Sequence, residues 1–417
     1  MTAEIISVGD ELLIGQVVNT NQAFIAERLN SVGINVSRMT TVGDEESAIL
    51  EAFRQAYDRS NLVIVTGGLG PTHDDITRAM VCKFFHTSLI QDSQALENIK
   101  QLFGRRGLEV TKINQEQALV PRDCTVIQNA FGTAPGYFFN RDGKYFIVMP
   151  GVPTEMNGMM ENFIVPYFTQ HTSGLVIRHR TLKTTGIPES YLADKIGNTE
   201  ELFPVSAGIS LAYLPSFLGV RLRVTAKAKS AQQAEASIKE VERKIHERAG
   251  KYIYAADDEE LEHAVGKLLS ERKLTIVVAE SCTGGIIADR ITDVSGSSSY
   301  FERGMTTYSD DSKLVELGVP SVLIQQYGAV SKEVAEAMAF GIRTKCNVDI
   351  GISTTGIAGP TGGTTEKPVG LVWVGYSDRH ETFAMKFTFV NDRRRIKERT
   401  AQAALELLRR KLLKIEA

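Results

Sequence analysis

The chain has 417 residues, 43% hydrophobic and 23% charged, with a formal net charge of −3 and a sequence pI near 6.2. At about 150 residues per domain this length predicts two or three globular domains, and the charge argues against nucleic acid or an anionic membrane as a general partner. The four dispersed cysteines argue against a disulfide framework or a zinc site. With neither an export signal nor a membrane-spanning apolar run in the sequence, we expect a cytoplasmic protein.

The first part of the chain, residues 1–170, alternates short apolar runs with amphipathic stretches. Strands are predicted over 5–8 and 62–65, and helices over 21–32 and 46–57. Such alternation is typical of an α/β domain with a mainly parallel sheet.

A glycine-rich loop from Thr66 to Pro71 follows the second strand and precedes a helix predicted over 77–85. This order forms a cradle for phosphate, because glycine lets the backbone approach a ligand and a helix N-terminus presents free amides. A further strand over 146–149 ends in a proline-glycine loop at 150–153. Loops at strand ends are where α/β folds bind ligands.

The pattern of apolar and charged residues changes in the middle of the chain, over residues 171–255. Two strand-like runs, 208–214 and 220–228, precede a charged amphipathic helix over 232–249, which predicts a small α+β module. An acidic run at 257–260 then leads into another helix. It marks a domain boundary near residue 255, although four acids also suit a helix N-terminus.

The remaining residues, 256–417, return to α/β character. A helix is predicted over 261–272, and another over 400–415. Apolar residues recur at helical spacing in the second of these, which predicts that they face the core. They are Ala404, Leu405, Leu408 and Leu412.

Between an apolar strand over 274–278 and a helix beginning at Ile286 lies a turn containing Ser281, Cys282, Thr283, Gly284 and Gly285. A serine on such a turn, beside free amides at a helix N-terminus, suits acyl transfer. A plain helix cap is the alternative for Ser281 or Thr283. Cys282 is a rival nucleophile, since a thiol at a helix N-terminus ionises readily. No histidine occurs between Val265 and Arg379, which argues against a cysteine-histidine pair.

These motifs together resemble the CinA family of bacterial proteins over essentially the whole chain. The stretches that carry the resemblance are Gly9–Leu13, Asn19–Asn21, Gly67–Thr72 with Asp74, Asp75 and Thr77, Gly132–Gly136, the Ser281 turn, Gly296–Ser298, Thr307–Ser309 with Lys313, Gly328–Ser331 and Gly356–Pro360. The resemblance implies an α/β fold class with three parts. These are a molybdopterin-binding-like α/β domain, a KH-like α+β module and a C-terminal α/β amidohydrolase domain.

For the C-terminal domain, the resemblance implies hydrolysis of the carboxamide of nicotinamide mononucleotide to nicotinate mononucleotide and ammonia, without a cofactor. Ser281 resembles the family nucleophile, Lys313 its general base and Tyr308 a residue that orients or relays the proton. A lysine base needs its pKa lowered from about 10.4 toward neutrality, so we expect Lys313 to be buried. An ordinary solvated helix lysine is the alternative.

The substrate contacts of this domain follow from position along the chain. The amides of Thr283, Gly284 and Gly285 are expected to form the oxyanion hole. The loops containing Ser297, Ser298 and Gly359 are the candidates for binding the substrate phosphate. The run Arg393–Arg395 could contribute positive charge there, although we favour an exposed face before the last helix.

For the N-terminal domain, the resemblance implies a metal-dependent ADP-ribose pyrophosphatase. Asp75, with Asp10 and Asp74, would hold magnesium or a similar divalent ion, and Glu11 is a further acid on offer. The loop glycines Gly67, Gly68 and Gly70 would line the phosphate site. The alternative for Asp74 and Asp75 is capping of the following helix.

Two other functions stay open from the sequence. One is an active amidase joined to a pterin- or nucleotide-binding module without catalysis, and the other is an accessory role in DNA uptake or recombination. A KH unit clamps nucleic acid with a Gly-x-x-Gly loop, whereas Gly186–Glu189 lacks the second glycine, so we do not expect nucleic acid binding. Family likeness implies a homo-oligomer, expected to be a dimer.

Overall fold

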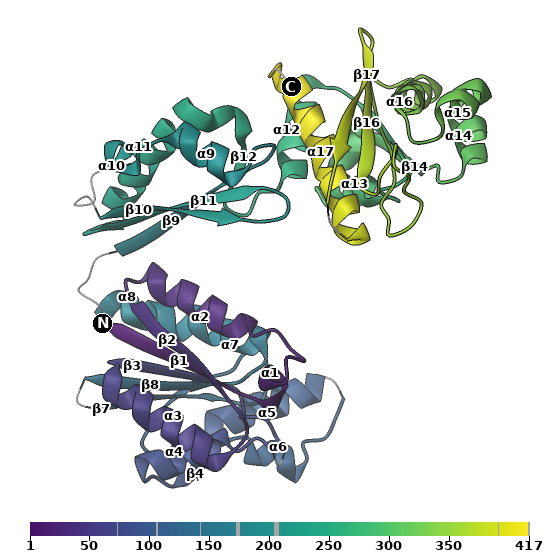
Figure 1. Ribbon diagram of the computed structural model, residues 1–417. Helices are drawn as coiled ribbons and strands as arrows, with labels where there is room; N and C mark the ends of the chain where they lie inside the picture. The colour runs from purple at the N-terminus through teal and green to yellow at the C-terminus, as the bar shows by residue number, and fades with distance from the viewer. Residues whose placement is uncertain are drawn as a thin grey trace. The chain divides into compact units, whose positions relative to one another are not determined.

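The computed structural model describes residues 1–72, 74–105, 107–141, 143–171, 176–203, 208–390 and 392–415. The chain forms two compact units (Figure 1). Unit 1 comprises Met1–Arg178 with Lys227–Glu235, and unit 2 comprises His179–Ala226 with Ala236–Ala417. Within the described ranges, every helix is too short or too polar to cross a membrane.

Unit 1 is built on a six-stranded sheet in the order β2–β1–β3–β8–β7–β6. The first four strands are parallel, while β7 and β6 are antiparallel to their neighbours. The strands are β1 (Thr2–Val8), β2 (Asn35–Val42), β3 (Leu62–Thr66), β6 (Thr125–Ile127), β7 (Gly136–Arg141) and β8 (Lys144–Met149), with a separate pair β4 (Leu89–Gln91) and β5 (Leu119–Pro121). The helices are α1 (Asp10–Leu13), α2 (Thr20–Ser31), α3 (Glu46–Arg59), α4 (Thr77–Phe85), α5 (Ser93–Arg105), α6 (Lys112–Glu116), α7 (Pro153–Met159), the π-helical turn η1 (Met160–Ile164) and α8 (Val165–His171).

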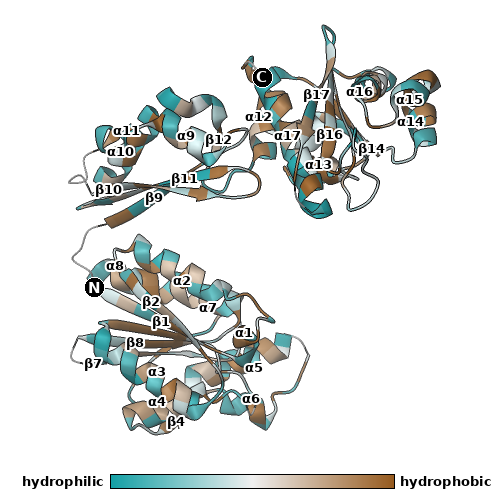
Figure 2. Cartoon of the chain, in the orientation of Figure 1, coloured by the Kyte–Doolittle hydropathy of each residue, from teal (hydrophilic) through white to brown (hydrophobic). Residues whose placement is uncertain are grey.

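Both faces of this sheet are covered. Helices α2 and α7 pack on one face around Ile5 and Ile64, and α3 and α4 pack on the other around Ile6 and Val65. Strands buried on both sides read as continuous apolar runs, and the central strands are accordingly brown in Figure 2. The predicted parallel α/β architecture is confirmed.

A small antiparallel sheet in the order β10–β11–β9–β12 lies mostly in unit 2, although residues 176–178 and 227–235 of its elements are assigned to unit 1. Its elements are β9 (Val176–Thr184), α9 (Glu189–Ile196), α10 (Thr199–Leu202), β10 (Ile209–Pro215), β11 (Val220–Ala228), α11 (Ala231–Ala249), the 3-10 turn η3 (Gly250–Tyr252) and β12 (Ile253–Ala256). The predicted α+β character of this module is confirmed.

The rest of unit 2 is built on a five-stranded sheet in the order β14–β13–β15–β16–β17. Strand β13 is parallel to both of its neighbours, and β16 and β17 run antiparallel. The strands are β13 (Ile276–Glu280), β14 (Phe301–Thr306), β15 (Ile350–Gly356), β16 (Leu371–Ser377) and β17 (Thr382–Thr388). The helices are α12 (Leu261–Arg272), α13 (Ile286–Thr292), the 3-10 turn η4 (Ser297–Ser299), α14 (Asp310–Leu317), α15 (Ser321–Tyr327), α16 (Lys332–Cys346) and α17 (Arg393–Leu413).

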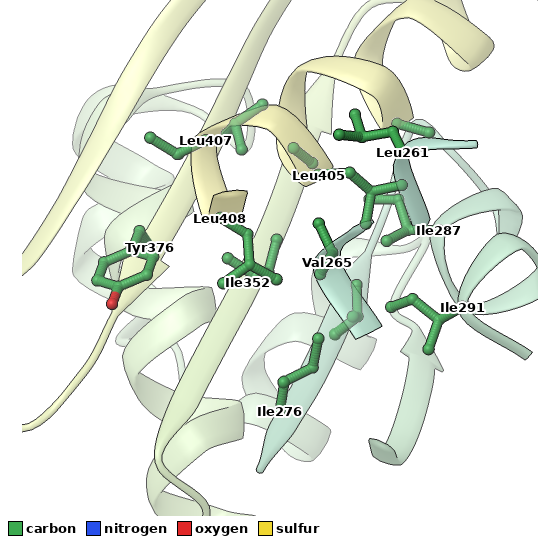
Figure 3. Packing of buried hydrophobic residues seen from close by; sticks show 14 of the residues in the cluster. Leu261, Val265, Ile276, Ile287, Ile291, Ile352, Tyr376, Leu405, Leu407 and Leu408 are labelled. Atoms are coloured by element: carbon green, nitrogen blue, oxygen red, sulfur yellow. The ribbon is translucent and has the colours of Figure 1, made fainter. Parts of the chain in front are cut away.

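Strand β13 shows how the sequence positions these helices. Side chains alternate along a strand, so Ile276 and Val278 face α12, α13 and α17, whereas Val277 and Ala279 face α16. Figure 3 shows the first of these two cores, with Leu408 of α17 next to Ile352 and with Val265 of α12 between α17 and Ile276.

The observed elements differ from the predicted ones in two places that matter for function. Strand β13 continues to Glu280 instead of ending at residue 278, and α17 begins at Arg393 instead of residue 400. The Arg393–Arg395 run is therefore the first turn of the last helix, not a segment before it. This corrects the sequence interpretation.

Candidate functional site

The carboxyl ends of three parallel strands of unit 2 meet at one edge of the five-stranded sheet. Ser281 follows β13, Thr307 and Tyr308 follow β14, and the loop containing Gly359 follows β15. The Ser281 amide donates to the Thr354 carbonyl at 2.9 Å, so sheet pairing continues up to the serine. In α/β folds, ligands bind at the carboxyl ends of the parallel strands, at the point in the sheet where the strand order reverses.

The helix after the Ser281 turn is capped by Glu280. The alternation along β13 puts this buried carboxylate on the α13 side of the sheet, where it accepts from the amides of Gly285 (3.0 Å), Ile287 (3.1 Å) and Ala288 (2.9 Å). The cap alternative for Thr283 is wrong, because its buried hydroxyl pairs with that of Thr354 at 2.7 Å. The Gly285 amide is likewise taken by Glu280, which corrects its expected place in an oxyanion hole. Thr283 and Gly284 remain as candidate donors.

The rival nucleophile is disfavoured by its surroundings. Cys282 is 5% exposed, and burial, reinforced by nearby Glu280, raises the pKa of its thiol to about 12. A thiol that stays protonated near neutral pH is a weak nucleophile. Ser281, 8% exposed, is the remaining candidate on the turn.

The expectation that Lys313 is buried is confirmed, since it is 1% exposed. Burial lowers the pKa of its amine, while the nearby Asp310 carboxylate raises it to a lesser extent. The Nζ atom donates to the carbonyls of Thr307 and Tyr308, both at 3.1 Å, and of Ser309 at 3.3 Å. Three carbonyl acceptors suit an ammonium group, and among the described residues none of its hydrogen bonds goes to Ser281.

Two cationic side chains of α17, Arg393 and Lys397, also lie at this edge. The sequence analysis placed Arg393 before the last helix and did not consider Lys397. Arg393 donates from Nη2 to the Tyr308 hydroxyl at 2.9 Å and from Nη1 to the Gly359 carbonyl at 2.7 Å. One helical turn later, Lys397 lies so close to Gly284 that a Cβ on the glycine would be 3.2 Å from Nζ. The i, i+4 spacing of Arg393 and Lys397 was a usable signal only once the helix start was known.

Ser297 and Ser298 lie at the wrong end of the sheet for contact with a substrate at Ser281 within this chain. They precede β14, and the Tyr300 carbonyl beside them accepts from Ile276, the first residue of β13. Ser281 follows the other end of β13, roughly 16 Å away at about 3.3 Å per residue. This position corrects their assignment to the phosphate loop.

A second candidate site is a cavity of about 520 Å³ in unit 1, at the carboxyl ends of β1 and β3. Its wall includes Gly67, Gly68 and Gly70 of the predicted phosphate loop. Only glycine fits at position 67, where φ is +110° and a Cβ would lie 2.1 Å from the Val8 carbonyl oxygen.

The predicted metal ligands do not form a cluster. Asp74 and Asp75 line the cavity, and one Asp75 oxygen accepts from the Thr72 amide at 2.9 Å. Asp10 is exposed and exchanges hydrogen bonds with Asp44, its Oδ1 accepting from the Asp44 amide at 3.2 Å. It is absent from the cavity wall, which corrects its assignment as a ligand. Within the described ranges, three or more His, Cys, Asp or Glu residues nowhere gather in a metal-binding set.

The sequence analysis gave no role to two polar residues of this cavity wall. Asn21 donates to the Gly151 carbonyl at 2.7 Å, and its own buried Oδ1 has no hydrogen-bond donor within the described part of the chain. Half-buried Glu155 accepts from Asn129 at 2.7 Å, and burial raises the pKa of its carboxyl. The lone Glu155 carried no local signal in the sequence, because its partner lies 26 residues away.

Three family models match successive parts of the chain. They are a probable molybdopterin binding domain over residues 4–170, a damage-inducible protein CinA KH domain over 179–255 and a CinA C-terminal domain over 258–412.

Individual relatives match over very different lengths. A CinA-like protein of Chloroherpeton thalassium is 45% identical over 417 residues, which cover 98% of this chain and 99% of the relative. A CinA-like protein of Salinibacter ruber is 43% identical, covering 99% of this chain and 100% of the relative. The crystal structure of the competence/damage inducible protein CihA from Agrobacterium tumefaciens is 37% identical and covers 36% of this chain and 91% of that chain, with a TM-score of 0.35.

Proposed function

The chain belongs to the CinA family, and on this premise we propose that unit 2 hydrolyses the carboxamide of nicotinamide mononucleotide at Ser281. The products would be nicotinate mononucleotide and ammonia. The observation that carries the proposal is the buried amine of Lys313, with a lowered pKa, beside the strand end that bears Ser281. Seryl-lysyl chemistry needs such an amine and no histidine.

The proton transfer follows from the hydrogen bonds of Lys313. As an ammonium it satisfies the three carbonyls of the 307–309 turn. As a neutral amine it keeps two N–H groups and gains a lone pair, so that it can accept the Ser281 hydroxyl proton as Oγ attacks the carboxamide carbon. The same proton then goes to the departing nitrogen as the C–N bond breaks, and water hydrolyses the acyl-serine.

The other groups at the edge have roles that suit a mononucleotide. The amides of Thr283 and Gly284 are the donors for the oxyanion, and the Lys397 ammonium beside Gly284 adds positive charge there. Arg393, already bonded to Tyr308 and Gly359, is our candidate for the substrate phosphate, which a guanidinium can bind with two parallel hydrogen bonds.

The test is ammonia release from nicotinamide mononucleotide by wild type and the Ser281→Ala, Lys313→Ala and Cys282→Ala variants. We expect the first two variants to lose about 10³-fold or more in kcat, because the nucleophile and its base act as a unit, while Cys282→Ala stays active. Lys313→Met, which keeps the apolar stem, controls for loss of folding when the buried side chain is shortened. Loss of activity only in the cysteine variant would refute the assignment.

For unit 1 we propose binding of ADP-ribose in the 520 Å³ cavity, with hydrolysis of its pyrophosphate. Asp74 and Asp75 beside the glycine loop fit magnesium without a full protein cage, since Mg²⁺ commonly takes one or two carboxylates together with substrate phosphates. When bound, such an ion neutralises charge on the phosphate oxygens.

Release of AMP from ADP-ribose, with Mg²⁺ and with a chelator, tests this second activity. We expect metal-dependent AMP release that Asp75→Asn abolishes. Tight ADP-ribose binding without any AMP release would instead leave unit 1 as a binding module.

A further inference from the structure

A cavity of about 580 Å³ within unit 2 belongs to neither candidate site. One wall is the Gly186–Glu189 loop before α9 and the turn around Phe217, and the other is β17 and helix α17. Its volume lies in the range of ligand pockets, which favour the junctions between modules. The Gly186–Glu189 loop lacks the nucleic-acid clamp of a KH unit, but it lines this cavity.

One residue of the cavity wall, Gln402, carries a buried side-chain donor without an acceptor among the described residues. Gln402 of α17 is 4% exposed, and its Oε1 accepts from Nη2 of Arg290 at 2.9 Å. Because a guanidinium can only donate, the Gln402 oxygen must face Arg290 and the Gln402 nitrogen must point away from it. That Nε2 is buried and has no hydrogen-bond partner among the described residues. A buried donor left unpaired costs about 1–3 kcal/mol, which a ligand acceptor would recover.

The same wall carries an unpaired cation. Half-buried Arg399 stacks on Phe389, with 4.8 Å from its Cζ to the ring centroid, and makes no ion pair with any of the described residues. By contrast, the lining carboxylate Glu406 is neutralised by Arg409 and Arg410, whose Nε atoms each lie 2.7 Å from its oxygens. The other lining carboxylate, Glu189, is exposed. Arg399 is therefore the group available to an anion.

Flat apolar surfaces complete the lining. Half-buried Phe387 and exposed Phe217 lie on opposite walls, whereas the ring of buried Phe389 is already covered by Arg399 and by Phe387, whose centroid is 5.8 Å away. Aromatic faces of this kind accept a planar ring.

We propose that this cavity binds a nucleoside monophosphate. The planar base would lie against Phe217 and Phe387. An acceptor on the base would pair with Nε2 of Gln402, and the phosphate would pair with Arg399. The site is separate from the Ser281 edge, although α17 contributes to both.

The test is calorimetric titration of the full-length chain with AMP, and with adenosine and ribose 5-phosphate as fragments that lack the anion and the ring. We expect AMP to bind at least tenfold more tightly than either fragment. Ala403→Phe, which fills the cavity from α17, and Arg399→Gln should each weaken this binding at least tenfold. The matched control Arg394→Gln changes an exposed arginine on the same helix outside the cavity and should bind AMP as wild type does.

Binding of AMP in the unit 1 cavity would be unaffected by these α17 variants, so the two sites are distinguishable. The proposal is overturned if wild type binds no AMP at millimolar concentration, or if Ala403→Phe and Arg399→Gln both bind it as wild type does. Because Arg399 is half-buried and makes no ion pair in the described part of the chain, its substitution tests the site even if the larger Ala403→Phe side chain prevents folding.

Discussion

At the scale of single residues, burial around the strand ends has opposite effects on the pKa of Lys313 and of Cys282. The Lys313 side chain is 1% exposed, and burial lowers the pKa of its amine. Burial raises the pKa of the Cys282 thiol to about 12. Both shifts favour the neutral form of the group, because a charged group loses its hydration when it is buried.

The lowered pKa of Lys313 predicts a pH dependence for the proposed deamidase. The reacting form is the neutral amine, so kcat/KM should rise with pH and level off above an apparent pKa below 10.4. Measuring kcat/KM from about pH 6 to about pH 10 checks this. A flat profile, or the same profile in Lys313→Met, would remove the lysine from the mechanism.

The same lowered pKa predicts a matching trend in stability. A lysine with a lowered pKa in the folded state binds fewer protons there than in the unfolded chain. Burying its charged form therefore destabilises the folded state, and this destabilisation is complete below the folded pKa. It disappears as the pH rises toward the pKa of the unfolded chain. Wild type should therefore gain stability relative to Lys313→Met across this interval, as measured by urea unfolding.

Glu280 gives a prediction for folding instead of chemistry. Its carboxylate accepts three amides of the α13 N-terminus, and Glu280→Gln replaces one of the two acceptor oxygens with a donor. We expect a loss of about 2 kcal/mol in the free energy of unfolding, measured in urea. The control is Glu271→Gln, an exposed residue of α12, which should be near neutral. Equal effects in the two variants would contradict the capping role.

At the scale of elements, the sequence predicted the existence and type of the long periodic segments better than their ends. Helix α12 has the predicted bounds, whereas α17 begins seven residues earlier than predicted. Its first turn is a run of arginines without apolar periodicity, and it is defined by Asp392, whose side chain accepts from the Arg395 amide. This difference hid the place of Arg393 at the candidate site.

Topology also explains why Ser297 and Ser298 were misassigned. A glycine-serine loop is recognisable in sequence, but which edge of the sheet it occupies depends on the direction of the following strand. In a parallel pair, the residues before β14 lie beside the start of β13, away from Ser281.

The early start of α17 leads to a prediction for substrate binding. Arg393→Gln should raise KM for nicotinamide mononucleotide about tenfold or more, through loss of a charge-assisted contact to phosphate. Nicotinamide riboside, which lacks the phosphate, should be affected far less. Arg394→Gln, an exposed neighbour paired with Glu398, is the control. Equal losses on both substrates would mean that Arg393 acts by holding Tyr308 and Gly359.

At the scale of the whole molecule, the α/β class and the intervening α+β module followed from composition and periodicity. The residues between 86 and 145 of unit 1, where the sequence analysis named no element, contain the 13-residue helix α5 together with α6 and several short strands. Helix α5 is long enough to be identified from its periodicity and was overlooked. The short strands carry too few periods to be identified, and their assignment depends on pairing partners elsewhere in the chain. The cavity walls could not be predicted for the same reason.

The division into two units predicts that their stabilities are separable. Ile64 on β3 is fully buried in unit 1, and Ile64→Ala should cost about 2–5 kcal/mol, lowering one calorimetric unfolding transition by roughly 5–15 °C. Ile352→Ala on β15 is the matched substitution in unit 2 and should lower the other transition. Ammonia release at 25 °C should survive the first change, because the Ser281 edge lies wholly in unit 2, and should decline with temperature sooner after the second. A single transition displaced equally by both variants would show that the units unfold together, and the two proposed activities would then share one stability.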